Sequence, residues 1–124
     1  MKALSRFRWT ALALLAIAAV AAIRLFGASA TVERDGLTYA DASLSSALES
    51  TQGAPGTRVL AQFVDADGID CRAFLASVVS GIACNERGGW HLRLIRDGVD
   101  LGDPAAVAAI EGDVRAAAGR MEAQ

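Results

Sequence analysis

The chain has 124 residues, which is enough for one small domain. Its charges are divided unevenly: residues 1–30 carry four basic and no acidic side chains, whereas residues 31–124 carry 14 acids and eight arginines, hence a net charge of −6. A domain with this balance cannot neutralise phosphates, so the composition argues against nucleic acid and anionic lipid as partners.

The first 30 residues are a short basic stretch followed by a predominantly apolar run. The run covers residues 9–27, close to the roughly 20 residues that span a bilayer, and Arg24 near its end can reach the headgroups. The alternative is a signal peptide cleaved near Ala30, because residues 28–30 (Ala-Ser-Ala) form a small-x-small site. Residues 1–30 are therefore a membrane anchor or a signal peptide, and in both cases the acidic remainder is exported.

Residues 31–41 show little periodicity and are interpreted as a tether. A short helix is predicted over about 42–50, because Leu44 and Leu48 are four residues apart. Either Asp41 or Ser43 can cap its first turn. A loop with two glycines and Pro55 follows this helix.

From Arg58 onward, strand-like runs separated by turn residues predict a four-stranded antiparallel meander. Asp67-Gly68 lies between two apolar runs and is a strong hairpin signal, because a two-residue type I′ turn needs positive φ at both positions. In that register Val64 faces Cys71.

The last two strands are predicted to be joined by a three-residue loop, Glu86–Gly88, with Gly88 in the left-handed conformation. This register pairs Trp90 with Cys84 and places Trp90 on the face that carries both cysteines. That face gathers the apolar positions of the strands, which are Leu60, Val64, Ile69, Cys71, Leu75, Ile82, Cys84, Trp90, Leu92 and Leu94.

The C-terminal segment predicts a second helix. Asp103 is a good N-cap, Pro104 suits the first helical position, and apolar residues from Val107 to Met121 recur every three or four residues. The expected fold class is α+β. An N-terminal membrane helix precedes an exported domain, residues 42–124, which has a short helix, a four-stranded antiparallel meander and a C-terminal helix, with both helices on one face of the sheet.

The opposite face of the predicted sheet is mixed, with charged residues beside two phenylalanines. We interpret five of its residues as a candidate binding patch: Phe63, Phe74, Arg72, His91 and Arg93. In the alternative interpretation Arg72 and the tether shield the two phenylalanines, which then have no binding role.

Cys71 and Cys84 are the only cysteines, and an even number of cysteines outside the cytoplasm predicts a disulfide, here between adjacent strands. With His91 they provide too few ligands and no standard spacing for zinc. Asp65, Asp67 and neighbouring residues resemble part of a calcium loop but lack the glutamate that completes an EF-hand. We expect no metal and no cofactor.

A hydrolase of the Ser-His-Asp type would need His91 as its base. The sequence has no G-x-S-x-G motif, and Ser80 falls within a predicted strand rather than a nucleophile elbow. No residue is therefore assigned a catalytic role, and the protein is predicted not to be an enzyme.

The stretch DADGIDCRAF followed by SGIACNERGGWHL resembles a D-G-x-x-C-R-x-F … G-x-A-C-x-x-x-G-x-W pattern. This pattern is typical of periplasmic domains of proteobacterial membrane anti-sigma factors and of surface-antigen-like envelope proteins. The resemblance covers about residues 43–92 and implies an exported domain. Only about eight residues precede the apolar run, too few for the cytoplasmic part that holds a sigma factor, so no sigma factor is expected as a partner.

These observations predict a single-pass protein of a bacterial inner membrane, held by residues 9–27, with a non-enzymatic periplasmic domain for envelope sensing or binding and an envelope protein as its partner. The alternative is a soluble periplasmic or secreted binding protein released by cleavage near Ala30. A small periplasmic hydrolase is the third hypothesis.

Overall fold

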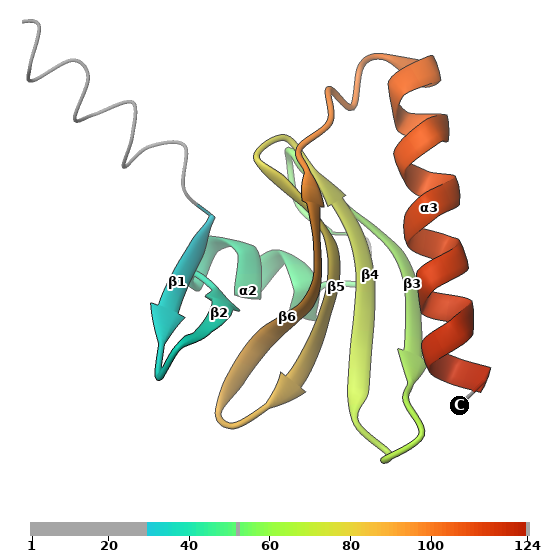
Figure 1. Ribbon diagram of the computed structural model, residues 1–124. Helices are drawn as coiled ribbons and strands as arrows, with labels where there is room; N and C mark the ends of the chain where they lie inside the picture. Colours follow the sequence, from blue (N-terminus) through green and yellow to red (C-terminus); the bar gives the residue numbers. More distant parts are fainter. Residues whose placement is uncertain (1–29, 52, 124) are drawn as a thin grey trace, which may run out of the picture.

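The structure is a computed structural model that describes residues 30–51 and 53–123 (Figure 1). The segment interpreted as a membrane anchor or signal peptide lies outside the described residues, apart from Ala30. Within the two described ranges, no helix combines the length and the apolar character needed to cross a membrane.

The centre of the fold is a six-stranded antiparallel sheet in the order β1-β2-β6-β5-β4-β3 (Figure 1). The strands are β1 (Thr31–Arg34), β2 (Leu37–Ala40), β3 (Thr57–Val64), β4 (Asp70–Ala76), β5 (Val79–Glu86) and β6 (Gly89–Asp97). The prediction of a four-stranded meander is therefore wrong. It fails because residues 31–41, interpreted as a tether, contain two further strands.

The additional strands form a hairpin with a two-residue turn. Arg34 pairs with Leu37, and the intervening Asp35 and Gly36 both have positive φ, at 54° and 78°. This is the geometry of a type I′ turn, for which Asp-Gly is a favoured pair because glycine has no Cβ to clash at positive φ. β2 then pairs with β6 and so joins the hairpin to the rest of the sheet.

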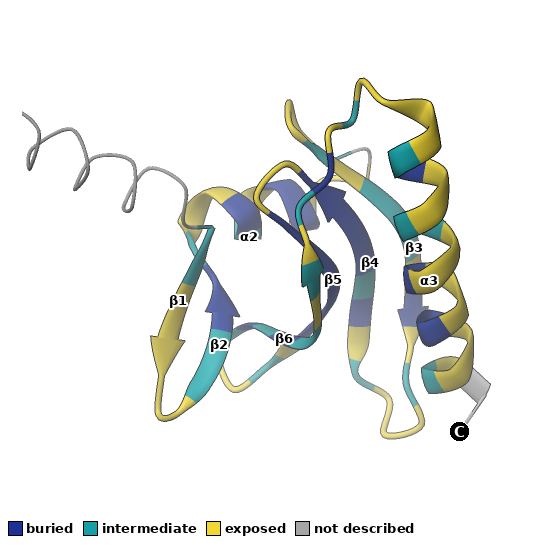
Figure 2. Ribbon diagram, turned by 45° about the horizontal axis from the view of Figure 1, so that its top comes forward, coloured by how far each residue is buried: buried dark blue, intermediate teal, exposed yellow. Residues whose placement is uncertain are grey.

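The two described helices lie on opposite faces of the sheet, so the prediction that they share one face is wrong (Figures 1 and 2). The helices are α2 (Ala42–Glu49) and α3 (Pro104–Ala123). Neighbouring residues of a strand point to opposite faces, yet residues 73–76 of β4 are all buried. Such a strand needs a cover on each face, and α2 and α3 supply the two covers.

Each helix closes its own apolar core. The buried residues on the α3 face are Phe63, Cys71, Ala73, Leu75, Ile82, Cys84, Val99, Val107, Val114, Ala117 and Ala118. Those on the α2 face are Ala40, Leu44, Leu48, Phe74, Ala76, Val79, Ala83, Trp90 and Leu92.

Asp103 caps α3 as the sequence predicts, and of the two candidate caps for α2, Asp41 and Ser43, it is Asp41 that caps the helix. The carboxylate of Asp41 accepts a hydrogen bond from the backbone N–H of Leu44 at 2.8 Å, ahead of α2. The carboxylate of Asp103 accepts from the N–H groups of Ala105 and Ala106 at 3.1 and 3.3 Å, ahead of α3. These bonds satisfy backbone donors that the first turn of a helix leaves without a partner.

The β3–β4 connection is longer than the two-residue turn predicted from Asp67-Gly68. Its first residue, Asp65, accepts hydrogen bonds with its side chain from the N–H groups of Asp67 and Ile69, both at 2.9 Å. These bonds stabilise a five-residue loop over 65–69, as aspartate side chains commonly do at turns.

The longer loop moves the register of this hairpin by one residue. Cys71 pairs with Phe63 rather than with Val64. Because a one-residue shift reverses the face of every side chain, Phe63 enters the α3-side core, and Val64 is left 53% exposed.

The β5–β6 turn is also different from the prediction. It has two residues, Arg87 and Gly88, both with positive φ, in place of the predicted three-residue loop. Cys84 therefore pairs with His91, and Trp90 lies in the α2-side core, on the face opposite the two cysteines.

Candidate functional site

Cys71 and Cys84 form the disulfide that the sequence predicts. They lie directly opposite each other on β4 and β5, with their Cα atoms 4.0 Å apart. Both are completely buried in the α3-side core. The bond therefore ties two interior strands of the sheet together beneath α3. It is shielded from solvent, as expected of a structural rather than a catalytic pair.

The structure does not bring the five residues of the candidate binding patch onto one surface. Phe74 and Arg72 lie on the α2 face, where the Arg72 guanidinium stands 5.2 Å from the centre of the Trp90 ring. Phe63 and His91 lie on the α3 face. Both phenylalanines are core residues.

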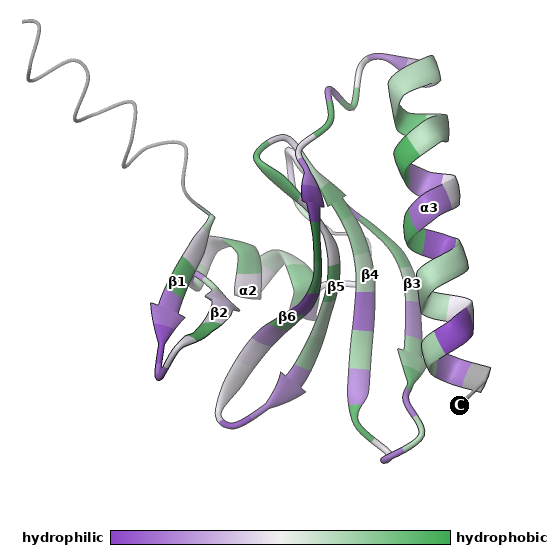
Figure 3. Ribbon diagram, in the orientation of Figure 1, coloured by the Kyte–Doolittle hydropathy of each residue, from purple (hydrophilic) through white to green (hydrophobic). Residues whose placement is uncertain are grey.

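The polar members of the patch on β6 belong instead to a network of ion pairs. Arg93 bonds to both oxygens of Glu86, at 3.1 and 2.7 Å, and to Asp65 at 2.5 Å. Glu86 also accepts a hydrogen bond from Nδ1 of His91 at 2.6 Å. Glu86 is the last residue of β5, and Figure 3 shows this end of the strand as hydrophilic. The network joins the β3–β4 loop to β5 and β6.

The network changes the acidity of its members. The hydrogen bond from Arg93, assisted by that from His91, lowers the pKa of Glu86 from 4.5 to about 2. The pKa of Asp65 is also lowered, first by the hydrogen bond from the Ile69 N–H and then by Arg93. The two carboxylates in turn raise the pKa of Arg93. All three groups are therefore charged at neutral pH, as a set of ion pairs requires.

We expect the free energy of unfolding to fall in acid partly because of Glu86. A carboxylate with a lowered pKa stabilises the folded state above its unfolded pKa, near 4.5, and this stabilisation is lost as the pH falls through about 2. Solvent screening limits the contribution to about 1–2 kcal/mol. Urea unfolding at pH 7, 4 and 2 measures it, with Glu86→Gln as the matched control. Equal loss of stability in the wild type and in Glu86→Gln would contradict this role of Glu86.

The network does not include the serine of the hydrolase hypothesis. Ser80 is completely buried, and its hydroxyl accepts a hydrogen bond from the Ala76 N–H at 3.3 Å. Ser80 is four residues away along β5 from Cys84, and Cys84 is the residue that pairs with His91, so the serine is not placed beside the histidine.

In the part of the chain that the structure describes, no three histidine, cysteine or acidic side chains are grouped so as to hold a metal ion.

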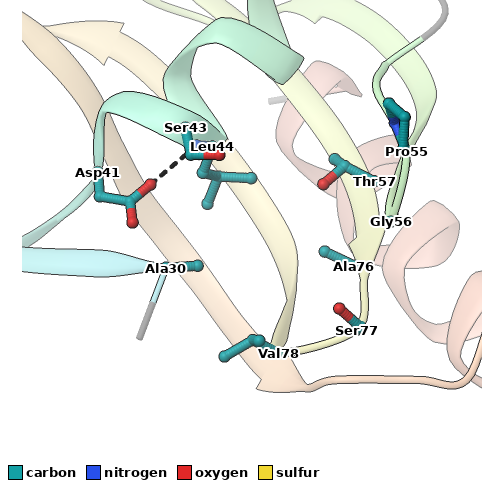
Figure 4. A pocket seen from close by; sticks show the side chains of 10 residues that line it. All are labelled: Ala30, Asp41, Ser43, Leu44, Pro55, Gly56, Thr57, Ala76, Ser77 and Val78. Carbon is teal, nitrogen blue, oxygen red and sulfur yellow. Dashed lines mark hydrogen bonds between the residues drawn. The ribbon is translucent and has the colours of Figure 1, made fainter. Parts of the chain in front are cut away.

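A pocket of about 350 Å³ opens at the opposite end of the sheet, on the α2 side (Figure 4). Four segments meet there: residue 30, the start of α2, the loop before β3 and the β4–β5 turn. Its walls are formed by Ala30, Asp41, Ser43, Leu44, Pro55, Gly56, Thr57, Ala76, Ser77 and Val78. The volume is within the range of small-molecule sites.

The pocket combines one carboxylate with several hydroxyl groups. One oxygen of Asp41 is used for the N-cap, and the other has no hydrogen-bond partner among residues 30–51 and 53–123. The hydroxyls of Thr57 and Ser77 point toward the middle of the pocket (Figure 4). Neither they nor the hydroxyl of Ser43 bond to another described residue. The pocket can therefore accept a cationic or hydrogen-bond-donating group while apolar carbon lines the rest of it.

The sequence alone does not predict this pocket. Asp41 was recognisable as a cap, but the remaining walls come from segments up to about 50 residues apart that share no motif. No protein-family model, no curated protein and no solved structure matches the chain.

Proposed function

We propose that the chain is a single-pass protein of a bacterial inner membrane, with residues 9–27 in the bilayer and a non-enzymatic binding or sensing domain in the periplasm. The observation that carries this proposal is the Cys71–Cys84 disulfide. Disulfides persist in oxidising compartments, among them the bacterial periplasm, and are rare in the cytosol. The basic residues ahead of the apolar run support the same orientation, because such residues stay on the cytoplasmic side.

The contacts of Ala30 favour retention of the N-terminal segment over its cleavage. The carbonyl of Ala30 accepts a hydrogen bond from the N–H of Asp41 at 2.9 Å, and its side chain packs against the α2-side core. Cleavage after Ala30 would remove both interactions next to the first turn of α2. The anchored form is therefore preferred to the cleaved, soluble binding protein.

A binding role is supported by the kind of site that the domain contains. Its pocket presents a carboxylate and hydroxyls from three of its four segments, but no base is placed beside a nucleophile there. The resemblance of residues 43–92 to periplasmic domains of membrane anti-sigma factors and surface-antigen-like envelope proteins agrees with binding or sensing. An envelope protein is the proposed partner.

A fusion experiment tests the proposed topology. Alkaline phosphatase joined after Gln124 should be active, because this enzyme needs an oxidising compartment for its own disulfides, and a fluorescent cytoplasmic reporter at the same position should be dark. The mass of the intact protein, purified from the membrane fraction, should include residues 1–30. An inactive phosphatase with a fluorescent reporter would refute export, and a mass that begins at Thr31 would favour the cleaved form.

A further inference from the structure

We propose that the pocket beside Ala30 binds the primary ammonium group of a phospholipid headgroup, so that the domain rests on the surface of its own membrane. This inference rests on the proposed function, since it requires residues 9–27 to lie in the bilayer. It adds a ligand of defined chemistry and an orientation of the domain relative to the membrane.

The length of the chain places the pocket at the membrane surface. Three residues lead from Gly27, the end of the apolar run, to Ala30, which forms part of the pocket wall. Three extended residues reach at most about 10 Å. The polar headgroup region of one leaflet is about 5–8 Å deep, so the pocket must open within or just above it.

The charge of the pocket selects the headgroup. Asp41 contributes the only formal charge among the lining residues, and one of its oxygens is free to accept a hydrogen bond. A primary ammonium offers three N–H donors, whereas the quaternary ammonium of a choline headgroup offers none. The excess of acids over arginines in residues 31–124 disfavours headgroups with a net negative charge.

The remaining walls suit the rest of such a headgroup. The hydroxyls of Thr57 and Ser77 point into the pocket and can donate to phosphate oxygens (Figure 4). Val78, 45% exposed at the rim, and Leu44 provide apolar contacts for the carbon atoms that link the ammonium to the phosphate. The ammonium would thus lie at Asp41 and the phosphate at the hydroxyls.

The test uses the full chain in detergent, titrated with phosphatidylethanolamine or with phosphatidylcholine of the same acyl chains. Native mass spectrometry counts the lipids that remain bound. Asp41→Asn is the informative variant, because asparagine is an equally good N-cap and preserves α2 while removing the charge. Glu49→Gln, an exposed acid at the other end of α2, is the matched control. Urea unfolding confirms that both variants are folded.

The wild type and Glu49→Gln should retain phosphatidylethanolamine in preference to phosphatidylcholine. Asp41→Asn should lower the affinity for phosphatidylethanolamine about tenfold or more, the effect of losing one charge-assisted hydrogen bond. Equal retention of the two lipids by the wild type, or the same loss in Glu49→Gln, would overturn the inference. Free ethanolamine that binds as tightly as the lipid would assign the pocket to soluble amines instead.

A second measurement separates this inference from the proposed function. The full chain is mixed with liposomes and floated on a density gradient. A chain that floats but shows no headgroup preference contradicts only the lipid site. A chain that stays at the bottom contradicts the membrane anchor, and the lipid site with it.

Discussion

Replacing Cys71 and Cys84 together by alanine is expected to lower the free energy of unfolding by about 3 kcal/mol. The bond links residues 13 positions apart, and closing a loop of that size removes about this much free energy from the unfolded chain in the chain-entropy model. Small domains are stable by only about 5–15 kcal/mol, so this is a large share. Alanine is the appropriate replacement because serine would place a hydroxyl in a completely buried site.

Urea unfolding with and without a thiol reductant measures this effect. Reductant present through unfolding and refolding should lower the midpoint of the wild type toward that of the Cys71→Ala/Cys84→Ala variant, and it should leave the variant unchanged. A wild-type midpoint that is the same in both conditions, and equal to that of the variant, would show that the disulfide does not stabilise the fold.

Phe74→Ala is expected to lower the free energy of unfolding by about 3–5 kcal/mol. Phe74 is completely buried among the residues that α2 covers, including Leu48 and Trp90. Truncating a buried phenylalanine loses its transfer free energy and leaves a cavity. The size of the effect tests whether the residues beneath α2 form a tightly packed core. The sequence analysis expected both helices on one face and therefore did not include this second core.

The control for this substitution is Ile95→Ala on β6. Ile95 is 49% exposed, and surface substitutions of this kind change stability by about 0.5 kcal/mol or less. Chemical unfolding of both variants gives the comparison. Similar midpoints for Phe74→Ala and Ile95→Ala would mean that α2 does not pack on the sheet as described.

The features that could be predicted from the sequence are local ones. Asp41 and Asp103 mark the starts of α2 and α3 because a capping carboxylate acts within four residues of itself. The disulfide could be predicted because the two grounds for it, the expected export and the even cysteine count, do not depend on strand register.

The Asp-Gly pairs show where local reasoning fails. At Asp35-Gly36 the pair forms the two-residue turn that its chemistry favours, yet that segment was interpreted as a tether. At Asp67-Gly68 the same pair lies within a five-residue loop, because the side chain of Asp65 captures two backbone N–H groups. The geometry at Asp67-Gly68 is thus set by Asp65, two residues before the pair.

The faces of the strands could not be predicted because two strands carry irregularities. Leu60 in β3 and Arg93 in β6 are extra residues between consecutive pairs of their ladders. Each extra residue reverses the alternation of the side chains that follow it. Phe63 and Phe74 were assigned to one face for another reason: the five-residue loop over 65–69 shifts the β3–β4 pairing by one residue. The two side chains therefore lie on opposite faces, and the candidate patch built on them does not form one surface.

The candidate pocket could not be predicted from the sequence for a different reason. It depends on the position of Ala30 beside the β4–β5 turn, and this position follows from the pairing of β2 with β6. That pairing is long-range, and no motif in either strand indicates it.

We propose that this domain is exported and that the disulfide between β4 and β5 closes it there. Non-reducing tryptic mapping of the full chain, purified from the membrane fraction with its thiols blocked, is the test of both statements. Trypsin yields one peptide of residues 59–72 with Cys71 and one of residues 73–87 with Cys84. We predict that the two peptides are recovered as one linked species. Recovery of the two peptides separately, each with a blocked free thiol, would contradict both the disulfide and the export that maintains it.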